Sequence, residues 1–288
     1  MIVIDYSAIS ISNIIIQRMQ PEENLFRHMI LNSIRMYRKR YGKNYGEIVL
    51  ACDAANNWRK EYFPNYKANR KSSRSKSDLD WSLIFDLMNQ NLDEIRENFP
   101  YIVLKQDGME ADDIIAECVE YTQEFGQAEP VMIVSGDKDF AQLQRYSNVS
   151  QWSPIIKKPI VEKDPINKLK EHILRGDSSD GVPNILSNDN VFVEPDSRQT
   201  PLSKKKVEAF LAADDFKSVM TDDEYRNYCR NKKMIDLSEC PQKLKDIISK
   251  ELDKQLNNPG RVSNKSKVMN YFITNNCARL LENLNEFV

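Results

Sequence analysis

Histidine and cysteine are scarce in this 288-residue chain, and their scarcity limits the chemistry available to it. Only His28 and His172 occur, each within a predicted helix and without an acidic or serine partner at a suggestive spacing. We expect both to be ordinary structural or surface residues, which argues against Ser-His-Asp, Cys-His and zinc-dependent hydrolysis. The five cysteines are odd in number and form no C-x-x-C pair, so the sequence predicts neither a disulfide framework nor a zinc cluster.

Long apolar runs are also missing. No window approaches about 18 uninterrupted apolar residues, and the chain opens on a strand-like run instead of a basic stretch and hydrophobic leader. We therefore expect a cytoplasmic protein that does not contact the membrane. Charged residues make up 29% of the chain and apolar residues 41%, which is typical of a soluble globular protein. The length suits one α/β domain with a smaller appendage.

The formal net charge of −2 hides an uneven distribution. Between Trp58 and Ser77, seven Lys or Arg residues stand against the single acid Glu61, so this segment carries about +6 by charge counting. Aromatic residues are interleaved with the cations, a combination suited to gripping a nucleic-acid backbone and stacking bases. The alternative is a solvated basic helix face. The polar run 67–77 has no apolar anchor, and we predict that it is mobile until phosphate binds.

Carboxylates recur where predicted strands end. Asp5 follows the run 2–4, Asp53 follows 48–52, and Asp137 and Asp139 follow 131–134. Two further acidic groups bring the set to nine residues: Asp5, Asp53, Glu110, Asp112, Asp113, Asp137, Asp139, Asp177 and Asp180. Taken singly, each could cap a helix, occupy a turn or complement a helix dipole. Taken together, acids at the carboxyl ends of parallel strands converge in one crevice.

So many like charges would repel strongly unless cations lay among them. Oxygen ligands suit magnesium or manganese, and two such ions roughly 4 Å apart are a known arrangement for cleaving phosphodiesters. The sequence therefore predicts a divalent metal site.

Strands and helices alternate through the first half of the chain, which predicts an α/β fold with a mainly parallel sheet. We expect helices over residues 24–41, 78–99 and 110–125, with Asp78 as the N-cap of the second, and a strand over 101–104. A strand or hairpin is expected over 155–161 and a helix over 165–174. The remainder is predicted to form short helices.

The motifs, read in order, resemble a known family. They are Asp5, Cys-Asp53-Ala, Trp-Arg59 followed by Tyr66-Lys67-Ala-Asn-Arg70, Glu110-Ala-Asp-Asp113, Ser-Gly-Asp137-Lys-Asp139-Phe and Gly-Asp177-Ser-Ser-Asp180-Gly-Val-Pro. The set resembles the flap endonuclease and 5′ nuclease family. Within it, the sequence is most similar to the ribonucleases H of T-even-type bacteriophages, and the similarity runs along nearly the whole chain.

The resemblance implies a doubly wound sheet with its active site at the strand carboxyl ends. Residues 1–164 would form this nuclease core with a basic helical arch at about 56–80, and residues 165–288 a smaller helical lobe that holds duplex DNA. It also implies 5′ to 3′ removal of RNA primers and flaps during lagging-strand synthesis, with two Mg²⁺ ions or Mn²⁺ as a substitute. Partners would be RNA–DNA hybrid, duplex and flap DNA, and replication proteins such as a single-strand-binding protein or clamp. The protein would be a monomer, in the host cytoplasm if phage-encoded.

Residue roles follow from the same motif match. Asp5, Asp53, Glu110, Asp112 and Asp137 would surround the first metal, and Asp139, Asp177 and Asp180 would serve the second with help from Asp112 or Asp113. Lys67 and Arg70 would engage the scissile phosphate beside Asp112. Substrate contacts would come from Arg59, Lys60, Lys71 and Tyr66, the last by stacking a base.

One departure from the family pattern concerns the segment after Asp180. The family continues into a glycine-rich hairpin that contacts duplex phosphates and can hold potassium, whereas residues 183–194 contain no glycine. A potassium site is therefore in doubt, and duplex contacts would fall to Lys204, Lys205 and Lys206. Two alternatives remain open: a single-strand endoribonuclease with the same carboxylate core, and a DNA-structure-binding module without catalysis.

Overall fold

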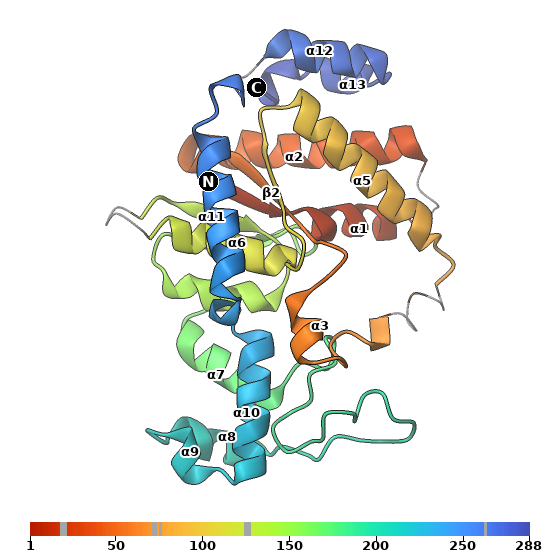
Figure 1. Ribbon diagram of the computed structural model, residues 1–288. Coiled ribbons are helices and arrows are strands. Elements are labelled where there is room, and N and C mark those ends of the chain that lie inside the picture. The colour runs from red at the N-terminus through yellow and green to blue at the C-terminus, as the bar shows by residue number, and fades with distance from the viewer. Residues whose placement is uncertain (18–21, 71–73, 75–76, 124–127, 262–263) are drawn as a thin grey trace.

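A six-stranded sheet forms the centre of the protein (Figure 1). The computed structural model describes residues 1–288 except 18–21, 71–73, 75–76, 124–127 and 262–263. The strand order is β3-β2-β1-β4-β5-β6. The strands are β1 (Ile2–Asp5), β2 (Ile48–Cys52), β3 (Ile102–Lys105), β4 (Val131–Val134), β5 (Val149–Ser153) and β6 (Lys158–Ile160). All neighbours pair in parallel except β6, which runs antiparallel to β5, so the predicted mainly parallel sheet is confirmed.

Both faces of the sheet are buried. Val3 of β1 belongs to one hydrophobic cluster, whereas Ile2 and Ile4 belong to a second. Because successive side chains of a strand point to opposite faces, the two clusters lie on the two sides of the sheet. A sheet buried on both faces needs nearly continuous apolar strands, which is the pattern of these short runs.

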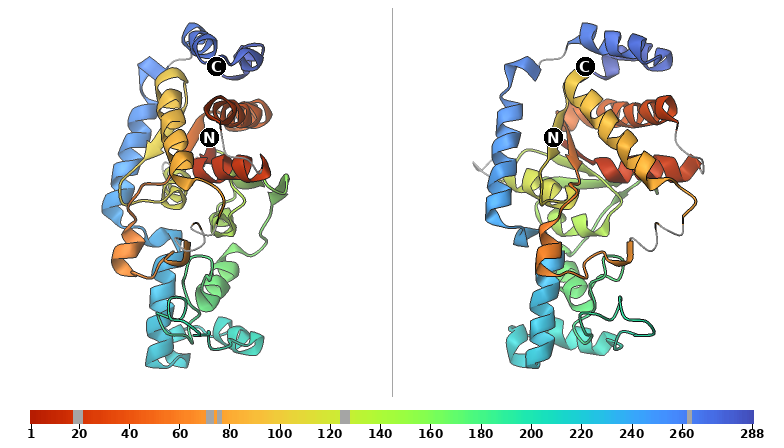
Figure 2. Two further views of the ribbon diagram at one scale, coloured as in Figure 1. Left: turned by 90° about the vertical axis from the view of Figure 1, so that its right-hand side faces the viewer. Right: turned by 45° about the vertical axis from the view of Figure 1, so that its right-hand side comes forward.

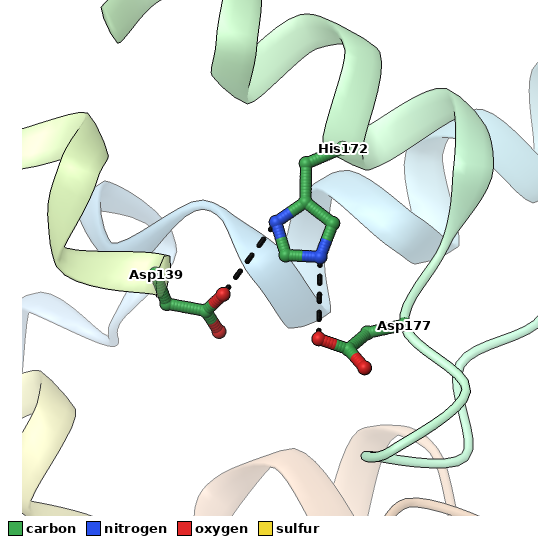
Figure 3. A group of neighbouring side chains, drawn as sticks. All are labelled: Asp139, His172 and Asp177. Atoms are coloured by element: carbon green, nitrogen blue, oxygen red, sulfur yellow. Dashed lines mark hydrogen bonds and ion pairs between the residues drawn. The ribbon is translucent and has the colours of Figure 1, made fainter. Parts of the chain in front are cut away.

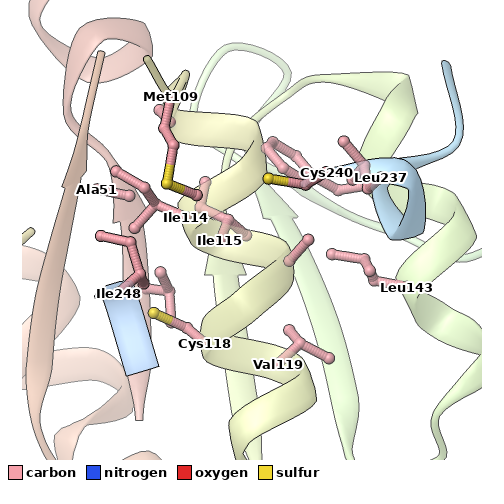
Figure 4. Close-up of a cluster of buried hydrophobic side chains, with 14 of the residues drawn as sticks. Ala51, Met109, Ile114, Ile115, Cys118, Val119, Leu143, Leu237, Cys240 and Ile248 are labelled. Atoms are coloured by element: carbon pink, nitrogen blue, oxygen red, sulfur yellow. The ribbon is translucent and has the colours of Figure 1, made fainter. Parts of the chain in front are cut away.

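The face that includes Val3 is covered by α6 (Ala111–Tyr121) and α11 (Gln242–Leu256), with α3 (Trp58–Tyr62), η2 (Lys138–Arg145) and η3 (Leu237–Glu239) around them. Figure 4 shows Ile114, Ile115 and Cys118 of α6 among side chains from the sheet and from α11. The opposite face packs against α1 (Tyr6–Gln17), α2 (Glu23–Tyr45), α5 (Trp81–Asn98), α12 (Lys265–Thr274), α13 (Ala278–Leu281) and the segment η5 (Leu284–Glu286). This two-sided covering confirms the doubly wound class.

A smaller helical lobe follows the sheet. It contains α7 (Pro165–Arg175), α8 (Lys204–Leu211), α9 (Phe216–Val219) and α10 (Asp222–Ile235), and its own core includes Leu174, Val207 and Phe210. The chain then returns to the sheet, with η4 (Pro259–Arg261) leading into α12. Figure 2 shows α12 and α13 at the opposite end of the molecule from α8 and α9.

The predicted lobe over 165–288 is therefore only partly separate in space. Ile248 of α11 and Phe272 of α12 are buried in the two sheet clusters, because the sheet faces offer apolar surface that these helices cover. The division of the chain at residue 164 stays a prediction.

The segment between β2 and α5 bears the predicted arch. After α3 it makes turns, and residues 69, 70 and 74 are helical among those that are described. Helix α5 begins at Trp81 because the side chain of Asp80 accepts the Leu83 N–H at 3.0 Å, so the predicted cap at Asp78 was wrong by two residues. Five residues of the run predicted to be mobile, 71–73 and 75–76, lie outside the described residues, and Lys71 is among them. No helix in the described part of the chain is long and apolar enough to cross a membrane.

Candidate active site

Two carboxylates lie where β1 and β2 end, at the point where the strand order reverses. Asp5 accepts hydrogen bonds from the Ala8 N–H (2.8 Å) and the Ser135 hydroxyl (3.1 Å). Asp53 accepts the Ala111 N–H at 2.9 Å and so lies against the amino end of α6. Strand β1 lies between β2 and β4, so the crevice at its carboxyl end is the expected ligand position of a doubly wound sheet.

These carboxylates are close enough to perturb one another. Burial, followed by the charges of Asp53 and Asp137, raises the pKa of Asp5 to about 7. Burial also raises the pKa of Asp112 well above its ordinary value, and Asp137, Glu110 and Asp5 add to it although Lys67 opposes them. Acids from β1, β2, α6 and the β4–η2 connection thus meet in one place. Such a group is destabilising without a cation, which is the condition that a divalent ion would relieve.

A second acidic group, formed by Asp139, Asp177 and Asp180, adjoins the first. Asp137 caps η2 by accepting the Asp139 N–H at 3.0 Å. Asp139 itself lies beside His172 of α7, which belongs to the lobe. Burial and Asp137 raise the pKa of Asp139 to about 7, with smaller contributions from Asp177 and Asp180 and an opposing one from His172. Hydrogen bonds from His172, Ser179 and Lys138 outweigh burial and hold the pKa of Asp177 below its usual range. The second group is therefore partly neutralised by the protein's own donors.

His172 lies between the two aspartates of this second group (Figure 3). Its Nε2 is 3.2 Å from Asp177 Oδ2, and its Nδ1 is 3.5 Å from Asp139 Oδ1. The expectation that this histidine lacks an acidic partner was wrong. Helix α7 ends at Gly176, whose φ of 67° turns the chain so that Asp177 faces back toward the last helical turn. The signal in the sequence was a histidine five residues before an aspartate, across a glycine that ends the helix.

The arch cations contact both acidic groups. Lys67 Nζ lies 2.6 Å from Glu110 Oε1 and 3.4 Å from Asp180 Oδ2, and Arg70 lies 2.8 Å from Asp180 Oδ1. Burial opposes protonation of Lys67, but Glu110 and Asp180 outweigh it and raise its pKa. Similarly, Lys67 and Arg59 outweigh burial and lower the pKa of Glu110. Lysine and arginine thus lie at the edge of the crevice, paired with its acids.

Close backbone approach holds the arch on the Asp180 turn. The Lys67 N–H donates to the Asp180 carbonyl at 2.7 Å. At Gly181, whose φ is 72°, a Cβ would lie only 3.0 Å from the Asn65 carbonyl oxygen. A glycine is needed here both for its conformation and for this contact.

The position of Tyr66 differs from the predicted one, in which its ring would stack a base. Its side chain is buried, and its hydroxyl is 2.9 Å from Glu110 Oε2 and 3.0 Å from Asp180 Oδ2. A ring held in this way is not available to stack a base. Instead it links the arch to both acidic groups.

Arg59 and Asp113 form a buried ion pair, which contradicts their predicted roles. Arg59 is 1% exposed and donates to both Asp113 oxygens at 2.8 Å and to the Met234 carbonyl at 2.9 Å. The Trp58 indole N–H also donates to Asp113, at 3.1 Å. With its oxygens engaged, Asp113 is not positioned as a metal ligand, and Arg59 is not exposed to substrate. The pair joins α3, α6 and the end of α10, and so fixes the walls of the crevice.

The remaining predicted substrate contacts lie on the surface. Lys60 is exposed on α3, and Lys204 and Lys205 are exposed in the first turn of α8. Lys206 pairs with Glu224 at 2.5 Å. Sequence reasoning missed Ser135 and Lys138, which touch Asp5 and Asp177 respectively. Both lie inside the Ser-Gly-Asp-Lys-Asp motif, so their position beside the recognised acids was the available signal.

The donor set fits a hard divalent cation. It is dominated by carboxylate oxygens, two of which belong to groups whose pKa is raised to about 7. Asp139 Oδ1 is buried and, among the described residues, has no hydrogen-bond partner. Hard cations such as Mg²⁺ prefer such oxygen ligands.

Comparison with known proteins agrees with this geometry. Residues 10–171 match the family model for the N-terminal, resolvase-like domain of 5′–3′ exonucleases, and residues 164–287 match that for the C-terminal part of T4 RNase H. Ribonuclease H of Enterobacteria phage T4 is 32% identical over 295 residues, which cover 99% of this chain and 94% of that protein. A 5′–3′ exonuclease of Buchnera aphidicola is 34% identical over 154 residues, half of each chain.

Solved structures share the fold. The bacteriophage T5 flap endonuclease, in a complex with DNA and metal ions, superposes with a TM-score of 0.65 at 15% identity, covering 89% of this chain and 99% of that one. The T5 5′-exonuclease with bound zinc gives a TM-score of 0.62 at 16% identity, with 88% and 99% covered. The carboxylate crevice, the doubly wound sheet and the match along the whole length lead to one conclusion: the chain belongs to the 5′–3′ exonuclease family of nucleases.

Proposed function

We propose that the protein is a Mg²⁺-dependent 5′–3′ nuclease that removes RNA primers from RNA–DNA hybrids and cuts 5′ flaps and ends of duplex DNA during lagging-strand replication. The observation that supports it is the meeting of Asp5, Asp112 and Asp139 in one crevice, although they are far apart in the sequence. Membership in a family of nucleases leaves the binding module without catalysis as the weaker alternative.

The two acidic groups suit two ions. Asp5, Asp53, Glu110, Asp112 and Asp137 would hold one, and Asp139, Asp177 and Asp180 the other. Such a pair supplies an activated water and charge stabilisation at the leaving oxygen. In this assignment Asp113 has no place, because Arg59 already occupies its oxygens.

The chain's own cations would then complete the site. Lys67 and Arg70 already lie against Glu110 and Asp180, so a phosphate entering the crevice would find two positive side chains on its arch side. Lys67 and Arg70 would orient the scissile phosphate and offset the negative charge that develops on it.

Duplex binding would use the lobe. Residues 183–203 contain no glycine, and their described structure is turns and irregular backbone before α8. Lys204 and Lys205 at the amino end of α8 are exposed, so backbone phosphates could meet both their charges and the helix terminus. We further propose a cytoplasmic monomer that meets a single-strand-binding protein or clamp, with Mn²⁺ as a substitute ion.

The test uses a 5′-labelled RNA–DNA hybrid and a 5′-flap DNA, each with Mg²⁺ or with chelator. We expect short 5′ products only with Mg²⁺, and none from Asp112→Asn. Asp86→Asn, on the exposed side of α5, serves as the matched control and should cleave normally.

Two results would contradict the proposal. Binding of both substrates without cleavage would support a binding module. Cleavage of unpaired RNA at internal positions, with the hybrid and the flap left intact, would instead support the single-strand endoribonuclease that shares the carboxylate core.

A further inference from the structure

The imidazole of His172 is placed so that each ring nitrogen faces a different carboxylate (Figure 3). On one side, Nε2 is 3.2 Å from Asp177 Oδ2, within hydrogen-bonding distance. On the other, Nδ1 is 3.5 Å from Asp139 Oδ1. The ring comes from α7, whereas the two acids come from η2 and from the turn after Gly176.

The number of protons on the His172 ring decides what each of its two nitrogens can do. A neutral imidazole carries one N–H, so one nitrogen donates and the other presents a lone pair. If Nε2 donates to Asp177, then the lone pair of Nδ1 faces the Asp139 carboxylate. That oxygen is buried and has no hydrogen-bond donor among the residues that the structure describes. Two electron-pair donors that face each other in a buried place are satisfied either by a second proton on the ring, as in an imidazolium, or by a metal cation bound to both.

We propose that His172 Nδ1 and Asp139 Oδ1 are both ligands of the second divalent ion, while Asp177 holds the ring in the required tautomer. This proposal rests on the proposed function for the second ion, but it makes Asp177 the partner of the ring instead of a direct ligand. A ligating histidine commonly donates its other N–H to a carboxylate, which fixes the orientation of the ring. With bonds of about 2.1 Å, adjacent ligands of one ion are roughly 3 to 3.5 Å apart, as these two atoms are.

Lys138 shares the Asp177 carboxylate with His172, but the two side chains differ in how firmly the fold holds them. Lys138 also reaches Asp177 Oδ2, at 2.9 Å, but its side chain is 60% exposed and can leave when an ion arrives. The side chain of His172 is 15% exposed and is carried by a helix. Its position beside Asp139 is therefore built into the fold.

A nitrogen ligand changes which ions the second position prefers. Imidazole binds Ni²⁺ and Co²⁺ better than Mg²⁺, whereas an all-oxygen position offers no such preference beyond the general affinity order. We therefore expect the second ion site, with His172 as a ligand, to bind transition metals more tightly than a site made of oxygen ligands alone would.

The experiment exploits the rarity of histidine. Mn²⁺ is bound to tag-free protein, and pulsed electron paramagnetic resonance measures coupling of the ion to imidazole nitrogen. Only His28 and His172 can supply that signal. The signal should be present in the wild type, kept in His28→Gln and lost in His172→Gln. By calorimetry, His172→Gln should lower the ratio of Ni²⁺ to Mg²⁺ affinity about tenfold or more.

A labelling control tests for a histidine ligand in the wild-type protein, so it does not depend on whether His172→Gln folds. In wild-type protein with ¹⁵N-histidine, the coupling pattern should change from that of ¹⁴N. Bound Mn²⁺ without imidazole coupling, or coupling that persists in His172→Gln, would overturn the proposal. The proposed function would survive that result if Mg²⁺-dependent cleavage were intact. Protein that neither binds Mn²⁺ nor cleaves would refute both.

Discussion

Removing the charge of Asp5 should stabilise the metal-free protein while abolishing its activity. Asp5 lies in a buried crevice with other acids, and its pKa is raised from 3.8 to about 7. In Asp5→Asn the carboxamide oxygen can still accept the Ala8 N–H, and its NH₂ can donate to the Ser135 hydroxyl oxygen. The substitution therefore removes the cost of burying a charge and the repulsion from Asp53 and Asp137, and it keeps the local hydrogen bonds.

The size of the expected stability change follows from the raised pKa of Asp5. A raised carboxyl pKa means that the folded state holds its proton more tightly than the unfolded chain does. The contribution of Asp5 to stability is thus complete below pH 3.8 and is lost as the pH rises toward 7. A rise of about three units at about 1.36 kcal/mol per unit costs the folded protein roughly 4 kcal/mol above pH 7. Because neighbouring acids share the repulsion, we expect Asp5→Asn to gain about 2 to 4 kcal/mol at pH 8 and less at pH 5.

Urea unfolding in the presence of chelator at pH 5 and pH 8 provides the measurement. Asp86→Asn, an exposed change on α5, is the control and should leave the free energy of unfolding nearly unchanged at both pH values. Adding Mg²⁺ should stabilise the wild type more than Asp5→Asn, since the ion offsets the same repulsion. A variant that is less stable than the wild type at pH 8 in chelator would refute the electrostatic reasoning.

Three further predictions test the arch, the crevice wall and the second acidic group. Lys67→Ala should mainly slow the cleavage step in single-turnover assays, whereas Lys205→Ala should weaken duplex binding and reduce its salt dependence; equal small effects would contradict this division. Arg59→Ala should destabilise the protein by about 3 to 5 kcal/mol in urea unfolding, because it leaves Asp113 buried and unpaired, and Arg59→Lys should not restore full stability. Gly176→Ala should lower the melting temperature and the metal affinity, since its Cβ would lie 2.4 Å from a backbone oxygen at a φ of 67°; an unchanged thermal scan would show that the turn can relax.

Much of the fold was predictable because it depends on local patterns. The apolar runs of β1, β2 and β4 are short and continuous, which is how buried parallel strands read, and helices separate most of them. The same regularity located the acids, since a residue that follows a parallel strand must lie at the same edge as its counterparts. Asp5 and Asp53 could therefore be assigned to one crevice before any coordinates were known.

Sequence alone thus determined the fold class, the family and the convergence of the acids, because each is set by residues near one another in the chain or by strand direction. The tertiary structure decided which charged residues are free to act. Arg59 and Asp113 lie in matching motifs, yet their mutual contact buries both. His172 gained its place only when the turn at Gly176 brought Asp177 back beside α7. Pairing and burial depend on contacts between distant segments, and a linear motif carries no record of them.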